Sequence, residues 1–302
     1  MTAEPVPCAV CGAMERQALF RPARSPGPVV RCGRCGMVYV SPRLDTHALI
    51  FKGADVGGEA AMSLSLDEVR GSWEWPILRT KEAERRALDR NSGIALDRLE
   101  QWVRPPGQLL DFGCGGGFFL GAAQARGWET TGLEPLPGHA AYARATFETQ
   151  VVVDTLRDDT FAPESFDAIT AFQVFEHLPQ PREDLARLAR SLRPGGALLI
   201  EVPNIETWTV KLLGARHRHF VQDHLNFFSA RTLGQLLTDA GLEVAGHYFP
   251  ARYLSMRHLT RHWLGRLGSW LPRLAERTGL NERLVRLNLG DIVAVVGRKP
   301  AP

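Results

Sequence analysis

The sequence predicts an α/β fold, in which a mostly parallel sheet is covered by helices on both faces, preceded by a small cysteine-rich module. Three observations predict this fold. Strand-like apolar segments alternate with helix-like amphipathic segments from residue 105 onward. A glycine-dense turn, residues 113–117, follows the first of these strands. Four of the five cysteines lie within the first 35 residues.

The composition indicates a globular chain of 302 residues with 44% hydrophobic and 23% charged residues, enough for one large domain or one domain plus a small module. No run of 18 apolar residues occurs, and residues 1–7 lack the charged and apolar regions of a secretory signal. We therefore expect a cytoplasmic protein. The net charge is +3, but residues 251–302 hold ten Lys and Arg against three Asp and Glu. This basic end fits anionic substrates, nucleic acid, a membrane surface, or an arginine-rich composition without a specific role.

The cysteine-rich module is predicted over residues 1–45. Cys8-x-x-Cys11-Gly and Cys32-x-x-Cys35-Gly are two knuckles with 20 residues between them. Each knuckle directs two thiolates at one point, and two knuckles form the four-sulfur site that zinc favours. Disulfides are the competing interpretation, but a cytosolic setting argues against them. Since four thiolates leave no open position, the zinc is expected to be structural.

Residues 46–104 are predicted to form a linker and N-terminal helices. Mixed signals with Gly53, Gly57, Gly58 and Gly71 suggest a linker that folds over a ligand. Residues 73–103 carry apolar residues at roughly helical spacing, which predicts one or two amphipathic helices. The turn at residues 105–107, Pro-Pro-Gly, closes this region.

The third region, residues 105–302, contains the alternating segments. Strands are predicted at 108–112, 128–133, 150–153, 166–172, 197–202, 242–249 and 291–297. Helices are predicted at 117–126, 137–146, 182–192 and 231–240. Within this region, residues 251–289 form an insertion before the last strand.

The glycine-dense turn indicates a nucleotide-type cofactor, because glycines allow close backbone approach and the next helix presents open amides. A dinucleotide fingerprint needs a third glycine where the chain has Phe118. The pattern D-x-G-x-G-x-G that begins at Asp111 resembles instead the first motif of class I S-adenosylmethionine (SAM)-dependent methyltransferases. The resemblance implies that Asp111, Gly113, Cys114 and Gly115 bind SAM. Cys114 is expected to fill space rather than act as a nucleophile.

Later stretches resemble the same superfamily in the same order. Glu134 ends the second strand, 23 residues beyond Asp111, where the superfamily binds both ribose hydroxyls. Asp154, Thr155 and Leu156 follow the third strand, where the family lines the adenine pocket. These matches, with Phe-Asp-Ala-Ile at 166–169 and Leu-Arg-Pro-Gly-Gly at 192–196, imply a doubly wound, seven-stranded, Rossmann-like sheet with a reversed last strand.

Gln173 follows the fourth strand, near the expected position of the methionine moiety and the methyl group. Some relatives that methylate quinone precursors carry an acid there and bind a divalent metal with it. The amide of Gln173 argues against a catalytic metal. His177, four residues on, is expected to be a helix-capping or core histidine.

The segment 216–229 lies over the carboxyl edge of the sheet, where open α/β folds bind ligands. Its Asp223-His224-Leu-x-x-Phe-Ser core resembles zinc-ribbon-bearing sugar C-methyltransferases, in which the corresponding histidine is a proposed general base. His224 is thus a candidate base, with a substrate-binding or structural role as the alternative. Those enzymes carry a second C-terminal α/β domain, so the resemblance covers the ribbon and the core only.

The insertion at 251–289 has apolar residues at helical spacing between residues 256 and 274, with arginines on other faces, which predicts a basic amphipathic helix kinked near Pro272. A lid over the active site, peripheral membrane contact through 251–287 and a dimer contact all fit this helix.

The sequence as a whole predicts a SAM-dependent methyltransferase with structural zinc and a small-molecule, sugar or glycan-type acceptor. Some ribosomal-RNA guanine methyltransferases also place a zinc ribbon before this fold, which leaves an RNA base methyltransferase as the alternative. The ribbon carries six Arg against three acids but lacks interleaved aromatics, which argues against nucleic acid as the partner. A non-catalytic SAM-fold adaptor is the second alternative. The oligomeric state does not follow from the sequence.

Overall fold

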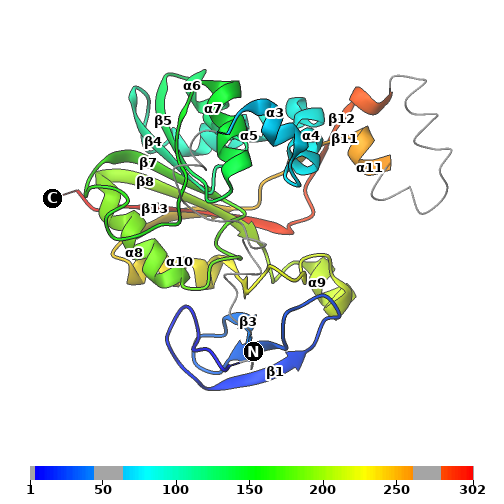
Figure 1. The fold of residues 1–302 in the computed structure, drawn as a ribbon. Coiled ribbons are helices and arrows are strands. Elements are labelled where there is room, and N and C mark those ends of the chain that lie inside the picture. Colours follow the sequence, from blue (N-terminus) through cyan, green and yellow to red (C-terminus); the bar gives the residue numbers. More distant parts are fainter. Residues whose placement is uncertain (1–3, 44–63, 261–279, 302) are drawn as a thin grey trace.

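The computed structural model describes residues 4–43, 64–260 and 280–301. A seven-stranded sheet lies at its centre (Figure 1). The strand order is β10-β13-β8-β7-β4-β5-β6. The strands are β4 (Gly107–Phe112), β5 (Trp128–Leu133), β6 (Gln150–Val152), β7 (Phe166–Phe172), β8 (Leu192–Pro203), β10 (Glu243–Tyr248) and β13 (Ile292–Arg298). All neighbours are parallel except β13, which is antiparallel to β8 and β10. This topology confirms the predicted doubly wound fold with a reversed last strand.

Helices cover both faces of the sheet because successive strand residues point to opposite sides. Leu110 and Ile169 belong to one buried cluster, while their neighbours Leu109 and Ala168 belong to another. The first face is covered by α8 (Pro181–Ser191) and α10 (Ala230–Asp239). The second is covered by α5 (Arg85–Leu99), α6 (Phe118–Gln124) and α7 (Pro137–Phe147).

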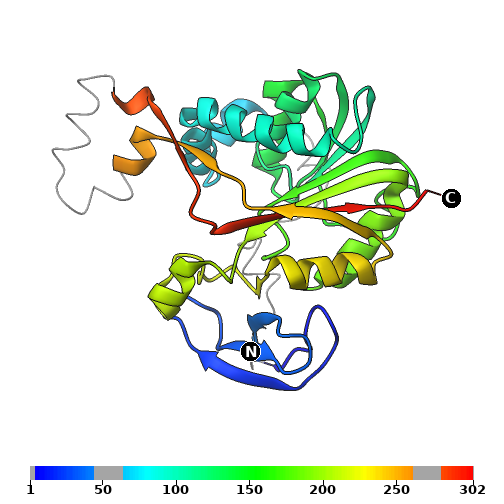
Figure 2. The same ribbon diagram turned by 180° about the vertical axis from the view of Figure 1, so that it is seen from behind.

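The cysteine-rich module forms its own small sheet, with the order β1-β2-β3-β9 (Figure 2). Its strands β1 (Arg16–Phe20), β2 (Val29–Cys32) and β3 (Val38–Val40) come from the N-terminus, but β9 (Asn226–Phe227) comes from the main domain. Val38 pairs with Phe227, and the amide of Val40 donates to the carbonyl of Leu225 at 2.9 Å. The sequence did not predict β9, and it joins the module directly to the segment 216–229.

In the described part of the chain, three N-terminal helices precede the core: α3 (Leu66–Gly71), α4 (Trp75–Ala83) and α5. The first begins before the predicted helical region. Glu74, at the start of α4, accepts hydrogen bonds from the amides of Gly138 (3.2 Å) and His139 (2.9 Å) at the N-terminus of α7. This contact fixes α4 over the edge of the sheet. The linker glycines Gly53, Gly57 and Gly58 lie outside the described residues.

The insertion before the last strand differs from the expected helix at both ends. β11 (Arg252–Ser255) pairs antiparallel with β12 (Leu284–Leu287). The short helix α11 (Met256–Leu259) follows β11 in the chain, and the short helix η4 (Leu280–Glu282) precedes β12. Asn91 of α5 anchors this arm through two hydrogen bonds with the backbone of Tyr253, at 2.8 and 3.0 Å. The predicted helix centre, with Trp263, Leu267, Trp270, Leu271 and Leu274, lies outside the described residues. No helix in the described ranges is long and apolar enough to span a membrane.

Candidate active site

The glycine loop connects β4 to α6 and has the backbone conformation that its sequence predicts. Gly113, Gly115 and Gly117 have φ values of +75°, +53° and +77°, in the left-handed region that favours glycine. A Cβ on Gly113 would lie 2.5 Å from Cγ2 of Val174, whereas one on Gly115 would meet no atom within 4 Å. The loop is therefore packed against the protein on one side and open on the other.

Asp111 and Glu134 lie next to this loop, although they are 23 residues apart in the sequence. Asp111 is 3% exposed and accepts a hydrogen bond from Oγ1 of Thr170 at 2.7 Å. Glu134 is 6% exposed, and its two oxygens accept the amides of Gly115 (2.8 Å) and Leu136 (3.0 Å). Desolvation raises the pKa of each acid to about 7, and the charge of Glu134 adds to the shift at Asp111.

The predicted adenine-side residues lie one strand further along, after β6. The carboxylate of Asp154 accepts the amide of Thr155 at 2.7 Å and pairs with Arg157. Leu156 is buried in the hydrophobic cluster on the α8–α10 face. Glu134 follows β5, and these residues follow its neighbour β6. The resemblance predicts the adenine-side residues at this position.

Gln173 has a φ of +57°, which is unusual for a residue with a side chain. Its amide donates to the carbonyl of Glu201 at 2.8 Å, and this bond holds the strained turn after β7. Strained backbone of this kind concentrates at functional sites.

A cavity of about 540 Å³ opens beside the loop, within the size range of small-molecule sites. It runs from Asp111 and the loop, past Gln173, to Asp291 and Ile292 at the start of β13. Helices α4 and α5 and the arm β11–β12 form its other walls. Cys114 and Gly115 line it as well, whereas Glu134 and residues 154–156 are not part of the lining.

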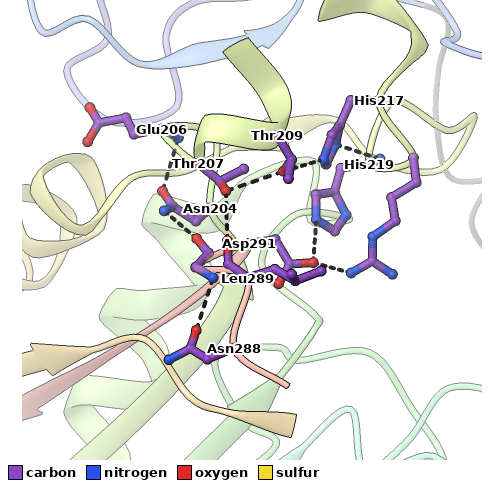
Figure 3. A network of polar contacts seen from close by, with 11 residues as sticks. Asn204, Glu206, Thr207, Thr209, His217, His219, Asn288, Leu289 and Asp291 are labelled. Atoms are coloured by element: carbon purple, nitrogen blue, oxygen red, sulfur yellow. Dashed lines mark hydrogen bonds and ion pairs between the residues drawn. The ribbon is translucent and has the colours of Figure 1, made fainter. Parts of the chain in front are cut away.

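A polar network holds the far wall of this cavity (Figure 3). Arg218 and His219 both face Asp291, with His219 Nε2 3.9 Å from the carboxylate. The same loop region is tied down by Asn204, whose side chain accepts the amide of Glu206 and donates to the carbonyl of Gly290 at 2.8 Å. The loop after β8 and the loop before β13 are thereby fixed to each other.

His224 lies behind this wall and is not part of the cavity lining. Its ring is 4.7 Å from the ring of His177 and 6.4 Å from that of His219, measured between centroids. Desolvation, followed by repulsion from His177, lowers the pKa of His224 to about 4. The imidazole is therefore neutral at pH 7 and a weak proton acceptor. This position and this pKa favour the structural or substrate-binding alternative for His224.

One cluster was not recognised from the sequence. Glu176, His177 and His224 bring ligand atoms within 4.8 Å of one another, a set that could hold a metal ion. Glu176 is 1% exposed, and neither carboxylate oxygen has a hydrogen-bond partner among the described residues. Burial raises its pKa to about 8. The backbone amides of Leu225 and Asn226 both donate to the carbonyl of Glu176, which holds the segment with His224 against the turn with Glu176 and His177. The only signal of this cluster in the sequence was that Glu176 and His177 are adjacent.

The four N-terminal cysteines come together as predicted. Sγ of Cys8 is 3.4 Å from Sγ of Cys35, and Cys11 is 3.5 Å from Cys32. All four thiols are free and lie within 4.8 Å of one another. Sulfurs around a tetrahedral zinc are about 3.8 Å apart for Zn–S bonds of about 2.3 Å, so this donor set fits a structural zinc ion.

Comparisons with known proteins agree with this geometry. A family profile described as a methyltransferase domain matches residues 84–247, which is more than half of the chain. Two relatives are named ubiquinone biosynthesis O-methyltransferase. One, from Idiomarina loihiensis, is 30% identical over 120 residues, which are 36% of this chain and 49% of that protein. The other, from Aromatoleum aromaticum, is 29% identical over 171 residues, which are 52% of this chain and 69% of that protein. The chain thus spans only about half the length of the first relative.

Two solved structures share the fold at low sequence identity. One is a chain of the complex between the Haloferax volcanii Trm112 methyltransferase activator and a putative methyltransferase. It matches with a TM-score of 0.54 and 21% identity, and the match covers 79% of this chain and 100% of that chain. The other is a possible histamine N-methyltransferase from Thermotoga maritima, with a TM-score of 0.50, 19% identity, and coverage of 78% and 100%.

The fold, the loop and the family match together define a SAM-dependent methyltransferase. The chain belongs to the methyltransferase domain family, whose cofactor is SAM.

Proposed function

We propose that this enzyme transfers the methyl group of SAM to a hydroxyl oxygen of a small-molecule acceptor, a class that includes the predicted sugar and glycan types. The carrying observation is the cavity of about 540 Å³ that continues from the glycine loop to β13. A pocket enclosed by α4, α5 and the β11–β12 arm suits a small acceptor better than a nucleic-acid duplex. The names of the two relatives support oxygen as the methylated atom.

Each predicted SAM residue has a role in this proposal. The carboxylate of Asp111 receives the SAM ammonium, and the open side of the loop at Gly113–Gly115 receives the methionine backbone. Glu134 binds the ribose hydroxyls. Its oxygens already accept two amides, but each retains a second lone pair for a hydroxyl. Residues 154–156 flank the adenine, and Gln173 lies near the methyl group.

Methyl transfer is an in-line displacement at the sulfonium carbon, so alignment of the acceptor oxygen is the main contribution of the protein. The acceptor hydroxyl loses its proton in this step. If His224 takes that proton, His224→Ala lowers turnover by about 10²- to 10⁴-fold while SAM affinity is unchanged. Because His224 lies outside the cavity lining and its pKa is about 4, we expect a smaller loss.

The proposal is tested by incubating the full chain with methyl-labelled SAM and a cell extract, then separating the products by size and RNase treatment. We expect label in small, RNase-resistant material, and Glu134→Ala should abolish both SAM binding and labelling. Label in large, RNase-sensitive material would replace this proposal by the RNA methyltransferase alternative. SAM binding without any transfer would favour the adaptor alternative.

A further inference from the structure

Three cationic side chains from separate parts of the chain line the same cavity. Lys81 comes from α4, Arg218 from the loop after β8, and Arg252 from β11. Their convergence depends on the tertiary fold, because up to 171 residues separate them in the sequence.

Two of these cations already have carboxylate partners. Arg218 pairs with Asp291, and Arg252 pairs with the buried Glu201 at the end of β8. Lys81 has no carboxylate partner among the residues that the structure describes. The residue keeps solvent-exposed surface, but the surrounding protein reduces the hydration of its ammonium group and the charge of Arg252 repels it, so the pKa of Lys81 is lowered. Lys81 therefore adds to the cavity a positive charge that no carboxylate in the described part of the chain pairs with.

Arg218 and Arg252 lie in the half of the cavity away from the glycine loop, beside Asp291 and Glu201. Lys81 lies nearer the loop, because Leu78 of the same helix is close to Gly116, and its charge acts on both His139 and Arg252. The loop follows β4, and Glu134 follows β5, so the cofactor residues gather at one side of the sheet. Ile292, at the far wall, pairs with Pro203 at the carboxyl end of β8. Three strand spacings separate β4 from β13, which is about 14 Å. Arg252 and Glu201 belong to this far half.

Apolar side chains also line the cavity. Leu254, Leu287 and Leu289 of the arm and Ile77 and Leu88 of the N-terminal helices face the cavity. A site with apolar walls and a charged end fits a ligand with an apolar body and one anionic group.

We propose that the methyl acceptor is an amphiphilic small molecule whose carboxylate or phosphate is bound by Lys81, with Arg252 beside it, while its apolar body lies against the arm. This inference rests on the proposed function and specifies the substrate class of the same site. The other source of such an anion is the carboxylate of SAM itself, and SAM binding distinguishes the two.

The test uses the full chain, methyl-labelled SAM and the small-molecule fraction of a cell extract, with the products passed over an anion-exchange resin. We expect the labelled product to be retained, and phosphatase treatment separates phosphate from carboxylate. Lys81→Met should reduce labelling about tenfold or more, as expected for the loss of a hydrogen bond to a charged group, with SAM affinity within about twofold of wild type. Lys81→Arg should restore labelling. Arg79→Met, an exposed position on the same helix outside the cavity lining, is the matched control and should label like wild type.

The outcomes separate this inference from the function it rests on. A labelled product that the resin does not retain would refute the anionic acceptor and leave methyl transfer to a small molecule standing. A tenfold loss of SAM affinity in Lys81→Met would assign the lysine to the cofactor carboxylate and refute the inference. Equal labelling by Lys81→Met and wild type would refute it too. SAM binding by wild type with no labelled product at all would overturn the proposed function and this inference with it.

Discussion

SAM affinity is expected to depend steeply on pH, because both acids at the glycine loop titrate near neutrality. The pKa of Asp111 and that of Glu134 are each raised to about 7, mainly by desolvation. Only the ionised form of Asp111 can pair with the SAM ammonium. Affinity should therefore fall as pH falls through 7, while the SAM amine, with an ordinary pKa near 8, stays mostly protonated.

The magnitude follows from the fraction of each acid that is ionised. For one carboxyl with a pKa of about 7, the dissociation constant rises about eightfold between pH 7.5 and pH 6.0. If both acids must ionise, the rise is about 70-fold. Asp111→Asn keeps a side-chain oxygen that can accept the hydrogen bond from Thr170. This variant should bind SAM at least about tenfold more weakly at pH 7.5, with a pH dependence reduced to the eightfold of Glu134 alone.

Isothermal titration calorimetry of SAM binding at several pH values measures this dependence, and repeating it in buffers of different ionisation enthalpy counts the protons released. Wild type should release protons at pH 6.5 on binding SAM, and Asp111→Asn fewer. A wild-type affinity that is flat from pH 6.0 to 7.5 would refute the reasoning. An Asp111→Asn variant with the full wild-type dependence would show that Asp111 is not one of the titrating groups.

Two further predictions concern the loop and the metal. Gly113→Ala should weaken SAM binding about tenfold or more, because its Cβ would lie 2.5 Å from Val174 and its φ is +75°. The control is Gly195→Ala, where φ is +79° and no atom lies within 4 Å of the added Cβ; it should lose similar backbone stability yet keep SAM affinity. Equal SAM affinities of the two variants in calorimetry would contradict the prediction. Wild type should contain one zinc ion per chain by elemental analysis. Cys35→Ser should lose the zinc ion and unfold at a lower temperature. Wild type that unfolds at the same temperature after its metal has been removed would contradict this prediction.

Local sequence signals predicted the parts of this protein that depend on local physics. Strand β7 occupies Phe166–Phe172, as its apolar run predicted, since both its faces are buried. The loop glycines and the cysteine knuckles were recognised because turn conformation and ligand spacing are set within a few residues. These signals predicted an α/β fold and a nucleotide-type cofactor, whereas the seven-stranded sheet and SAM were implied by the resemblance to class I methyltransferases.

Contacts between distant segments were not predictable in this way. β9 has only two residues, and its partner β3 lies nearly 190 residues away, so no periodic pattern marks it. β11, at Arg252–Ser255, precedes the residues with helical spacing, and it forms a strand because β12, about 30 residues later, pairs with it. The convergence of Lys81 with Arg252 likewise depends on how α4 and β11 pack around the cavity.

The pairing of β3 with β9 connects the cysteine-rich module to the segment that carries the cavity residue Arg218, although none of the four clustered cysteines lines the cavity. The segment that contains β9 also carries Arg218 and His224, and the amide of Leu225 donates to Glu176 while its carbonyl accepts from Val40. The glycine loop, by contrast, is held by Leu133 at the end of β5. Removal of zinc should therefore disturb acceptor turnover more than SAM affinity, because β9, in the segment that carries the cavity residue Arg218, shares a sheet with the module.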